Sequence, residues 1–270
     1  MIEAARRPPA RKIVKRLGKW LAARKAIEIV EEGGVRVLQI GGNAIQSAMR
    51  LDAPDRIELD YVRAMMVFLL FRPGPREVLM VGLGGGSMAR FIHQRMPQTR
   101  VTVVEINPGV VTAARRYFHF PEEDARLEIV VGDGAEVVPQ RPASCDVLVV
   151  DGFVNGSPAK DLCTRSFYDS AFAALRPGGV MVANFMSDDK RIETYCGRIE
   201  ESFGRNPTLL LAEEEDNVIA FALRGGPHRI PWAELKGRAR AAQRLFDLPL
   251  EECLADLRRR NSHTAQFLTL

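Results

Sequence analysis

Three acidic residues, Glu105, Asp133 and Asp151, stand at the ends of apolar runs that are typical of buried strands. In a parallel sheet the carboxyl ends of the strands meet at one edge, so we expect the three side chains to converge on one crevice. Glu105 also lies roughly 20 residues after a glycine-rich turn, where a carboxylate can accept hydrogen bonds from both hydroxyls of a ribose. Together these residues predict a nucleoside site.

A glycine-rich turn precedes the first of these acids, between an apolar run and the start of a helix. Within five positions it holds four glycines: Gly82, Gly84, Gly85 and Gly86. A strand, a glycine turn and a helix N-terminus bring bare backbone and N–H groups close to a ligand. The dinucleotide pattern would have a glycine where Ser87 stands, whereas glycines at alternate positions are usual in folds that bind S-adenosylmethionine. A tight turn without a ligand is the alternative.

Strand-like and helix-like segments alternate through the second half of the chain. The expected strands are residues 78–81, 101–104, 127–131, 146–150, 180–183, 208–211 and 218–223, and the last two form a hairpin. The expected helices are residues 87–95, 108–118, 167–175 and 192–203. This alternation predicts an α/β fold with a doubly wound, mostly parallel seven-stranded sheet.

Shorter alternating segments ahead of this region predict a small N-terminal antiparallel β-sheet. Residues 27–30 and 35–40 flank a Gly-Gly pair as in a β-hairpin, and residues 45–49 follow a second turn. Residues 61–71 are expected to form one buried helix. We therefore divide the chain into a basic leader (1–26), an N-terminal subdomain of hairpin and helix (27–72), and a nucleoside-binding domain (73–270) that ends in a helical cap.

The leader carries nine Lys or Arg residues among the first 25 positions, against the single acid Glu3. Such a segment can contact nucleic acid or another anionic surface, or it can be a solvated, partly helical extension. The second reading is favoured because no interleaving of aromatic and basic residues follows, so a nucleic-acid partner is not expected. No apolar run approaches about 18 residues, and no signal-peptide pattern is present. We expect a cytoplasmic protein without a membrane span.

Residue types that bind metals show no suitable spacing. The four cysteines, Cys145, Cys163, Cys196 and Cys253, are scattered, which argues against a metal site or a disulfide framework. The four histidines have no mutual spacing that suggests a metal site or a proton relay. The acidic run at 213–216 is interpreted as a solvated hairpin turn rather than a cation site. No metal is expected.

From about Ile27 to Leu223 the chain resembles the spermidine synthase (polyamine aminopropyltransferase) family. The resemblance is carried by Glu105, by the Gly-Asp-Gly sequence around Asp133, and by the segment 151–168, which matches the family's gatekeeping loop without a gap. It implies a sheet domain joined to a methyltransferase-like domain, and a homodimer. It also implies that the cofactor is S-adenosylmethionine or its decarboxylated form, with S-adenosylhomocysteine or methylthioadenosine as the product.

The resemblance also implies roles for single residues. Glu105 would bind the ribose, Asp133 the adenine amino group, and Asp151 would act as the general base for the attacking amine. The residues expected to contact the cofactor are Gln46, Gly82, Gly84, Gly85, Gly86, Glu105, Ile106, Asp133, Gly134 and Asp151. Those expected on the acceptor side are Tyr61, Phe153, Val154 and Tyr168, although a place in the core is equally open for Tyr168.

Departures from the family pattern concentrate on the polyamine half of the site. Gly85 stands where the family has an aspartate for the donor's propylammonium group, and Val154 stands where a second gatekeeping aspartate anchors the diamine. Lys160 stands where an acid is usual. A glycine loop without that aspartate would accept the carboxylate of ordinary S-adenosylmethionine, and Val154 makes the acceptor pocket more apolar than a diamine requires.

Four functions follow from these observations, in decreasing order of support. The first is a spermidine-synthase-like transferase, with aminopropyl transfer to a polyamine-type acceptor. The second is a methyltransferase with an unknown acceptor, since methyl transfer depends mainly on in-line positioning. The third is a non-catalytic protein that binds the nucleoside as a structural ligand. A nicotinamide-dependent oxidoreductase is disfavoured by Ser87.

Overall fold

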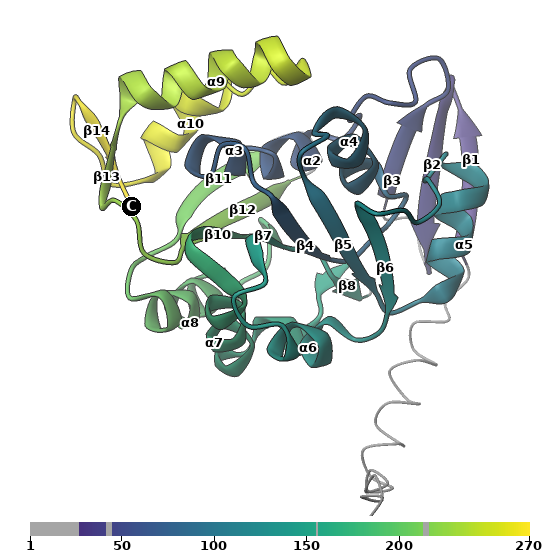
Figure 1. Ribbon diagram of the computed structural model, residues 1–270, viewed down its shortest axis with the longest axis horizontal. Coiled ribbons are helices and arrows are strands. Elements are labelled where there is room, and N and C mark those ends of the chain that lie inside the picture. Colours follow the sequence, from purple (N-terminus) through teal and green to yellow (C-terminus); the bar gives the residue numbers. More distant parts are fainter. Residues whose placement is uncertain (1–26, 42–44, 155, 213–215) are drawn as a thin grey trace, which may run out of the picture.

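The computed structural model describes residues 27–41, 45–154, 156–212 and 216–270. Its centre is a seven-stranded sheet with the strand order β11-β12-β10-β7-β4-β5-β6 (Figure 1). In chain order these are β4 (Glu77–Val81), β5 (Arg100–Glu105), β6 (Leu127–Val131), β7 (Cys145–Val150), β10 (Leu175–Met186), β11 (Thr208–Ala212) and β12 (Asn217–Leu223). The first five are parallel, and β12 pairs antiparallel with β10 and β11. The predicted α/β class and mostly parallel seven-stranded sheet are confirmed.

The chain changes direction across the sheet at β4. After β4 it adds β5 and β6 on one side, and β7 then returns to the other side of β4. In open α/β sheets such a reversal leaves a crevice outside the carboxyl ends of the strands, and ligands bind there. The topology therefore places a binding site where β4, β5 and β7 end.

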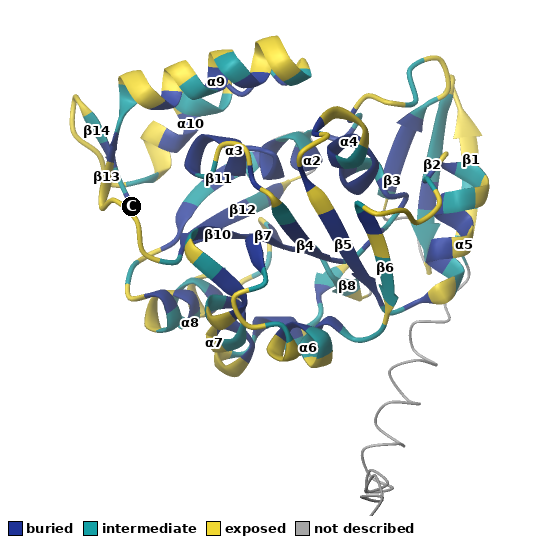
Figure 2. Ribbon diagram, in the orientation of Figure 1, coloured by how far each residue is buried: buried dark blue, intermediate teal, exposed yellow. Residues whose placement is uncertain are grey.

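Helices cover both faces of the sheet (Figures 1 and 2). On one face lie α2 (Asp60–Met65), α3 (Phe68–Phe71) and α4 (Ser87–Arg95), and on the other lie α6 (Gly134–Val137), α7 (Arg165–Ala174) and α8 (Ile192–Phe203). Successive strand residues alternate between the faces: Val147 and Val149 pack with the first group of helices, Leu148 and Val150 with the second. Burial on both faces explains the continuous apolar runs of the sequence.

A three-stranded antiparallel sheet precedes this domain. It consists of β1 (Ile27–Glu32), β2 (Val35–Ile40) and β3 (Ile45–Arg50), in that order across the sheet. It packs against α5 (Pro108–Tyr117) through a small buried cluster that includes Leu38, Met49 and Phe118. The predicted N-terminal antiparallel sheet is confirmed. The basic leader and most of the acidic run at 213–216 lie outside the described residues, and the division of the chain into domains stays a prediction.

The structure differs from the sequence prediction at several elements. Residues 61–71 form two short helices instead of one, because i→i+3 bonds such as Val67 N to Ala64 O tighten the turn between them. Strand β10 begins at Leu175 rather than at residue 180, since Leu175 already pairs with Cys145 before a bulge. After Pro231 come α9 (Trp232–Phe246), α10 (Cys253–Arg260) and a two-stranded pair of β13 (Arg229–Pro231) with β14 (Phe267–Thr269). This strand pair was not predicted.

Asp146 ties the segment that leads into β4 to the start of β7. Its side chain is 3% exposed and accepts hydrogen bonds from Arg76 N at 2.7 Å and Glu77 N at 3.0 Å. Arg72 Nη2 donates to the same carboxylate at 2.8 Å. A buried carboxylate needs such partners, and these three fix the register of the two central strands at their amino ends.

We predict that Asp146→Ala lowers the free energy of unfolding by about 2–4 kcal/mol, because it leaves two backbone N–H groups without their acceptor and Arg72 without its partner. Asp52→Ala is the matched control, since Asp52 is 70% exposed in its ion pair with Arg50 and its loss should leave the free energy of unfolding almost unchanged. Urea unfolding of both variants measures the difference. Equal losses would show that Asp146 does not tie the strands together.

Candidate active site

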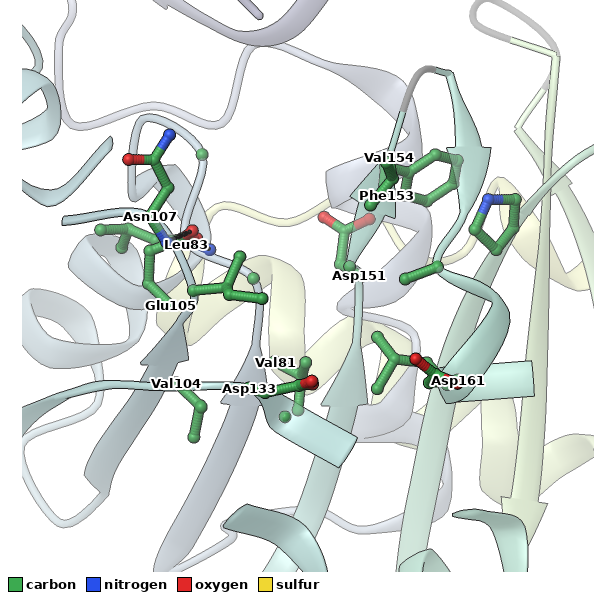
Figure 3. A pocket seen from close by; sticks show the side chains of 18 of the residues that line it. Val81, Leu83, Val104, Glu105, Asn107, Asp133, Asp151, Phe153, Val154 and Asp161 are labelled. Carbon is green, nitrogen blue, oxygen red and sulfur yellow. Dashed lines mark hydrogen bonds between the residues drawn. The ribbon is translucent and has the colours of Figure 1, made fainter. Parts of the chain in front are cut away.

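A cavity of about 490 Å³ opens at the carboxyl ends of the central strands, a volume typical of small-molecule sites. Its walls come from the glycine turn after β4, the residues that follow β5 and β6, and the segment that follows β7 (Figure 3). Glu105, Asp133 and Asp151 all line it. The three acids of the sequence analysis therefore meet at one cavity.

Two glycines let the loops around the cavity approach one another. Gly82 has a φ of +99°, and a Cβ atom there would lie 2.3 Å from the carbonyl oxygen of Asp151. A Cβ atom at Gly134 would lie 2.3 Å from Cγ1 of Val81. Because real Cβ atoms do not come so close to other atoms, a side chain at either position would push the loops apart. Glycine is needed here to keep β4, β6 and β7 together at the site.

Glu105 is buried at the end of β5, and both of its carboxylate oxygens accept backbone hydrogen bonds. Leu83 N donates to Oε2 at 2.9 Å, and Asn107 N donates to Oε1 at 2.8 Å. Burial raises the pKa of Glu105, and these hydrogen bonds oppose that rise. The backbone N–H of Ile106 is a third donor to this carboxylate. Since a carboxylate can accept about four hydrogen bonds, the side chain keeps acceptor capacity for a hydroxyl group in the cavity.

Asp133 is the N-cap of the short helix α6. Its Oδ1 accepts a hydrogen bond from Ala135 N at 2.9 Å, which is the usual role of an aspartate at this position. The residue also lines the cavity, opposite the turn formed by Lys160–Cys163 (Figure 3). The cap fixes the side chain at the cavity wall, where a carboxylate suits an amino group of a ligand.

Asp151 follows β7 and stands on the opposite side of the cavity from Glu105 (Figure 3). Asn184 Nδ2 donates to its Oδ1 at 2.8 Å. Burial raises the pKa of Asp151 to about 7, and the Asn184 hydrogen bond opposes the rise. A carboxyl group with such a pKa can bind and release a proton near neutral pH, which is what a general base requires.

The outer wall of the cavity is a short hairpin of β8 (Phe153–Val154) and β9 (Ser157–Pro158). It presents mainly apolar surface, and Val154 is 47% exposed. The Lys160–Cys163 turn then packs against α6 and brings Asp161 to the cavity. Arg191 also lines the cavity, and two hydrogen bonds of 2.8 Å pair its guanidinium group with Asp189.

Comparison with known proteins agrees with this geometry. The spermine/spermidine synthase domain matches residues 60–194. A polyamine aminopropyltransferase of Chromobacterium violaceum is 38% identical over 256 residues, which cover 95% of this chain and 98% of that protein. The chain belongs to the spermine/spermidine synthase family. The resemblance drawn from the sequence is confirmed.

Solved structures share the fold of this spermidine synthase-like chain. A probable spermidine synthase from Corynebacterium glutamicum superposes with a TM-score of 0.69 at 21% identity, over 90% of this chain and 95% of its own. Human methyltransferase-like protein 13, crystallised with S-adenosylhomocysteine, superposes with a TM-score of 0.63 at 26% identity, over 70% of this chain and 93% of its own. The methyltransferase-like character of the sheet domain is therefore also confirmed.

The structure brings most of the predicted site residues of this family member to the cavity. Those that line it are Gln46, Gly82, Gly84, Glu105, Ile106, Asp133, Gly134, Asp151, Phe153 and Val154. Four predicted residues do not line it: Tyr61, Gly85, Gly86 and Tyr168. Tyr61 contacts a residue that lines the cavity, since its hydroxyl group donates to the backbone oxygen of Gln46 at 3.2 Å.

The other three residues face the core. A Cβ atom at Gly85 would lie 2.7 Å from Oγ of Ser47 and 2.9 Å from Cδ1 of Phe118, and one at Gly86 would meet the ring of Phe120. Tyr168 belongs to α7, is 1% exposed and packs into the core, which agrees with the alternative of a core position for this residue. The space beside Gly85 is therefore filled, and the lost aspartate does not by itself open room for a ligand carboxylate.

Sequence reasoning missed several residues at the site. Leu83 and Asn107 contribute backbone N–H groups, which no side-chain pattern reveals. Asp161 was not predicted, because the departure from the family pattern lies at the neighbouring Lys160, where the family has an acid. Asn184 could have been predicted, since it is a polar residue directly after the expected strand 180–183, just as Asp151 directly follows the expected strand 146–150.

Within the described segments, no set of three or more His, Cys, Asp or Glu residues is arranged to hold a metal ion. None of the helices in that part of the chain combines the length and the apolar character that crossing a membrane requires.

The raised pKa of Asp151 should make the free energy of unfolding depend on pH. In the folded protein its pKa is about 7, against 3.8 for an unperturbed group, so between these pH values the folded state holds a proton that the unfolded state lacks. Stability should therefore fall by about 1.4 kcal/mol per unit as pH rises through this window, and level off above it. Asp151→Asn removes this contribution. The difference in unfolding free energy between wild type and variant, measured in urea from pH 4 to pH 8, should show the slope. Parallel curves would mean that Asp151 has an ordinary pKa.

Proposed function

We propose that this protein transfers an aminopropyl group from decarboxylated S-adenosylmethionine to an amine acceptor, with Asp151 as the general base. The observation that carries the proposal is the pair of carboxyl groups, buried Glu105 and half-buried Asp151, that line one cavity in a member of the spermine/spermidine synthase family. Each has a hydrogen-bond environment that suits a different role.

The donor side of the cavity suits an adenosine group. Glu105 lines the cavity and keeps acceptor capacity beyond its backbone hydrogen bonds, which suits the hydroxyl groups of a ribose. Asp133 at the far wall suits the adenine amino group, and Asp161 lies on the neighbouring turn. The glycine turn leaves backbone close to the sulfonium end of the donor. These contacts hold and orient the donor.

The chemical step requires a neutral amine. The amine nitrogen attacks the propyl carbon bonded to sulfur, the carbon–sulfur bond breaks, and methylthioadenosine leaves with the electron pair of that bond. The new secondary ammonium or the incoming primary ammonium gives its proton to the carboxylate of Asp151. Because the pKa of Asp151 is about 7, this proton transfer is efficient near neutral pH.

The acceptor side offers less negative charge than a diamine requires. Val154 supplies no charge at its position, and Phe153 and Pro158 add apolar surface. Arg191 is neutralised by Asp189. We infer that the acceptor is an amine whose far end is apolar or neutral, since a second ammonium group would meet an apolar wall at a cost of several kcal/mol.

Methyl transfer from undecarboxylated S-adenosylmethionine is the second candidate. It is favoured by the fold shared with human methyltransferase-like protein 13. The two candidates differ in the donor that the cavity prefers.

We expect calorimetry to show tighter binding of decarboxylated S-adenosylmethionine and methylthioadenosine than of S-adenosylmethionine. Asp133→Asn should weaken methylthioadenosine binding by about tenfold or more, because an amide still caps α6 but accepts a weaker hydrogen bond from the adenine amino group. Asp124→Asn, on an exposed loop, is the control and should bind as the wild type does. Preference for S-adenosylmethionine would support methyl transfer, and failure to bind any of the three would refute both activities.

Asp151→Asn should lower kcat for aminopropyl transfer by about 10²–10⁴-fold, the usual contribution of a general base. The affinity for methylthioadenosine should change little, since the donor is held mainly by other residues. Asp169→Asn on the exposed face of α7 serves as the control. The rate is measured from methylthioadenosine release with a panel of mono- and diamines. A variant that keeps wild-type kcat would exclude Asp151 as the base.

A further inference from the structure

Two buried asparagine side chains form a hydrogen-bonded chain behind Asp151. Asn184 Nδ2 donates to Asp151 Oδ1 at 2.8 Å, and Asn217 Nδ2 donates to Asn184 Oδ1 at 2.9 Å. Each asparagine is 5% exposed. Neither lines the cavity, so neither can contact a substrate. A polar pair buried in a sheet is costly unless it is satisfied, and here the chain ends on the candidate base.

The register of the sheet places these side chains in line. Ala183 on β10 pairs with Val150 on β7, so the next residue, Asn184, lies beside Asp151. On its other side β10 pairs with β12, and Asn217 lies opposite Met186. Residues two apart on a strand share a face, so Asn217 is the diagonal neighbour of Asn184. Strand pairing, rather than a loop, therefore fixes the geometry of the chain.

The direction of the hydrogen bonds follows from the chemistry of a carboxylate. An ionised carboxylate only accepts, so Asn184 must turn its NH₂ group toward Asp151 and its oxygen toward Asn217. Asn217 must then present its own NH₂ group, which also lies 3.6 Å from the weak acceptor Sδ of Met186. Both amide dipoles consequently point their positive ends toward Asp151, and this favours its charged form.

We propose that Asn184 and Asn217 are positioning residues, which orient the carboxylate of Asp151 and stabilise its ionised form through two aligned amide dipoles. This inference rests on the proposed function in one respect, namely that Asp151 acts on an acceptor amine. The alignment itself is a property of the free protein and can be measured without turnover.

Charged side chains do not supply this stabilisation. Those that line the same cavity are Glu105, Asp133, Lys160, Asp161 and Arg191. Burial and the Asn184 hydrogen bond account for the pKa of Asp151, about 7, without a contribution from any of them. Removal of the amide should therefore act on Asp151 directly.

The test is the titration of Asp151 by NMR in protein labelled with ¹³C at the aspartate carboxyl carbons, with the resonance identified by its absence in Asp151→Asn. Asn184→Leu keeps the branched shape of the side chain but has no hydrogen-bond donor, so it removes the hydrogen bond to Asp151. We expect the midpoint to rise by about one pH unit or more, as for the loss of a hydrogen bond to a charged group. Asn217→Leu should raise it by a smaller amount, because the Asn184 amide loses the donor that fixes its orientation.

Asn261→Leu is the matched control. Asn261 is held by two hydrogen bonds of 2.7 Å to the backbone of Leu209, so its replacement should lower the melting temperature and leave the Asp151 midpoint unchanged. If the two test variants only lower the melting temperature, as this control does, the proposal is overturned. Should Asn184→Leu fail to fold, Asn217→Leu decides alone, and an unmoved midpoint again overturns it.

Activity separates this inference from the proposed function. In an enzyme that transfers aminopropyl groups, Asn184→Leu should lower kcat at pH 7 by about tenfold, move the acidic limb of the kcat profile upward in pH, and leave methylthioadenosine affinity within about twofold. A moved midpoint in a protein that transfers no aminopropyl group would support the positioning role and refute the proposed function.

Discussion

A carboxylate buried inside a protein must receive hydrogen bonds, and Glu105 receives them from the backbone of two different loops. Leu83 belongs to the glycine turn after β4, and Asn107 belongs to the turn after β5. Because β4 and β5 are parallel neighbours, with Val81 paired to Val104, the loops leave the sheet side by side. One side chain thus joins both walls of the donor site, and the rest of the cavity is built around it.

Glu105 and Asp151 show how one cavity can give two acids different surroundings. Glu105 is buried and Asp151 is half-buried, and desolvation raises the pKa of each. Glu105 is surrounded by backbone donors that favour its ionised form and hold it still, which suits binding. Asp151 receives a side-chain amide from β10 instead, and its pKa of about 7 suits proton transfer. The contrast comes from the hydrogen-bond donors around each acid, at the ends of β5 and β7 on either side of β4.

The sequence carries much of this architecture, because the apolar runs and the acids that end them are local signals. The convergence of Glu105, Asp133 and Asp151 follows from the rule that parallel strands end at one edge of the sheet. Other features depend on contacts between distant segments and leave no local pattern. That Gly85 faces the core depends on Ser47 and Phe118, and the place of Asn217 behind Asp151 depends on the register of two antiparallel strands. Neither can be read from spacing along the chain.

The central claim is that the cavity holds an adenosine group between Glu105 and Asp133, with its sulfur directed toward Asp151. A crystal structure of the protein soaked with methylthioadenosine tests this most directly. The account predicts ribose hydroxyl groups within hydrogen-bond distance of both Glu105 oxygens, the adenine amino group at Asp133, and the methylthio group on the Asp151 side. Methylthioadenosine bound elsewhere, or bound here with its ribose away from Glu105, would contradict it.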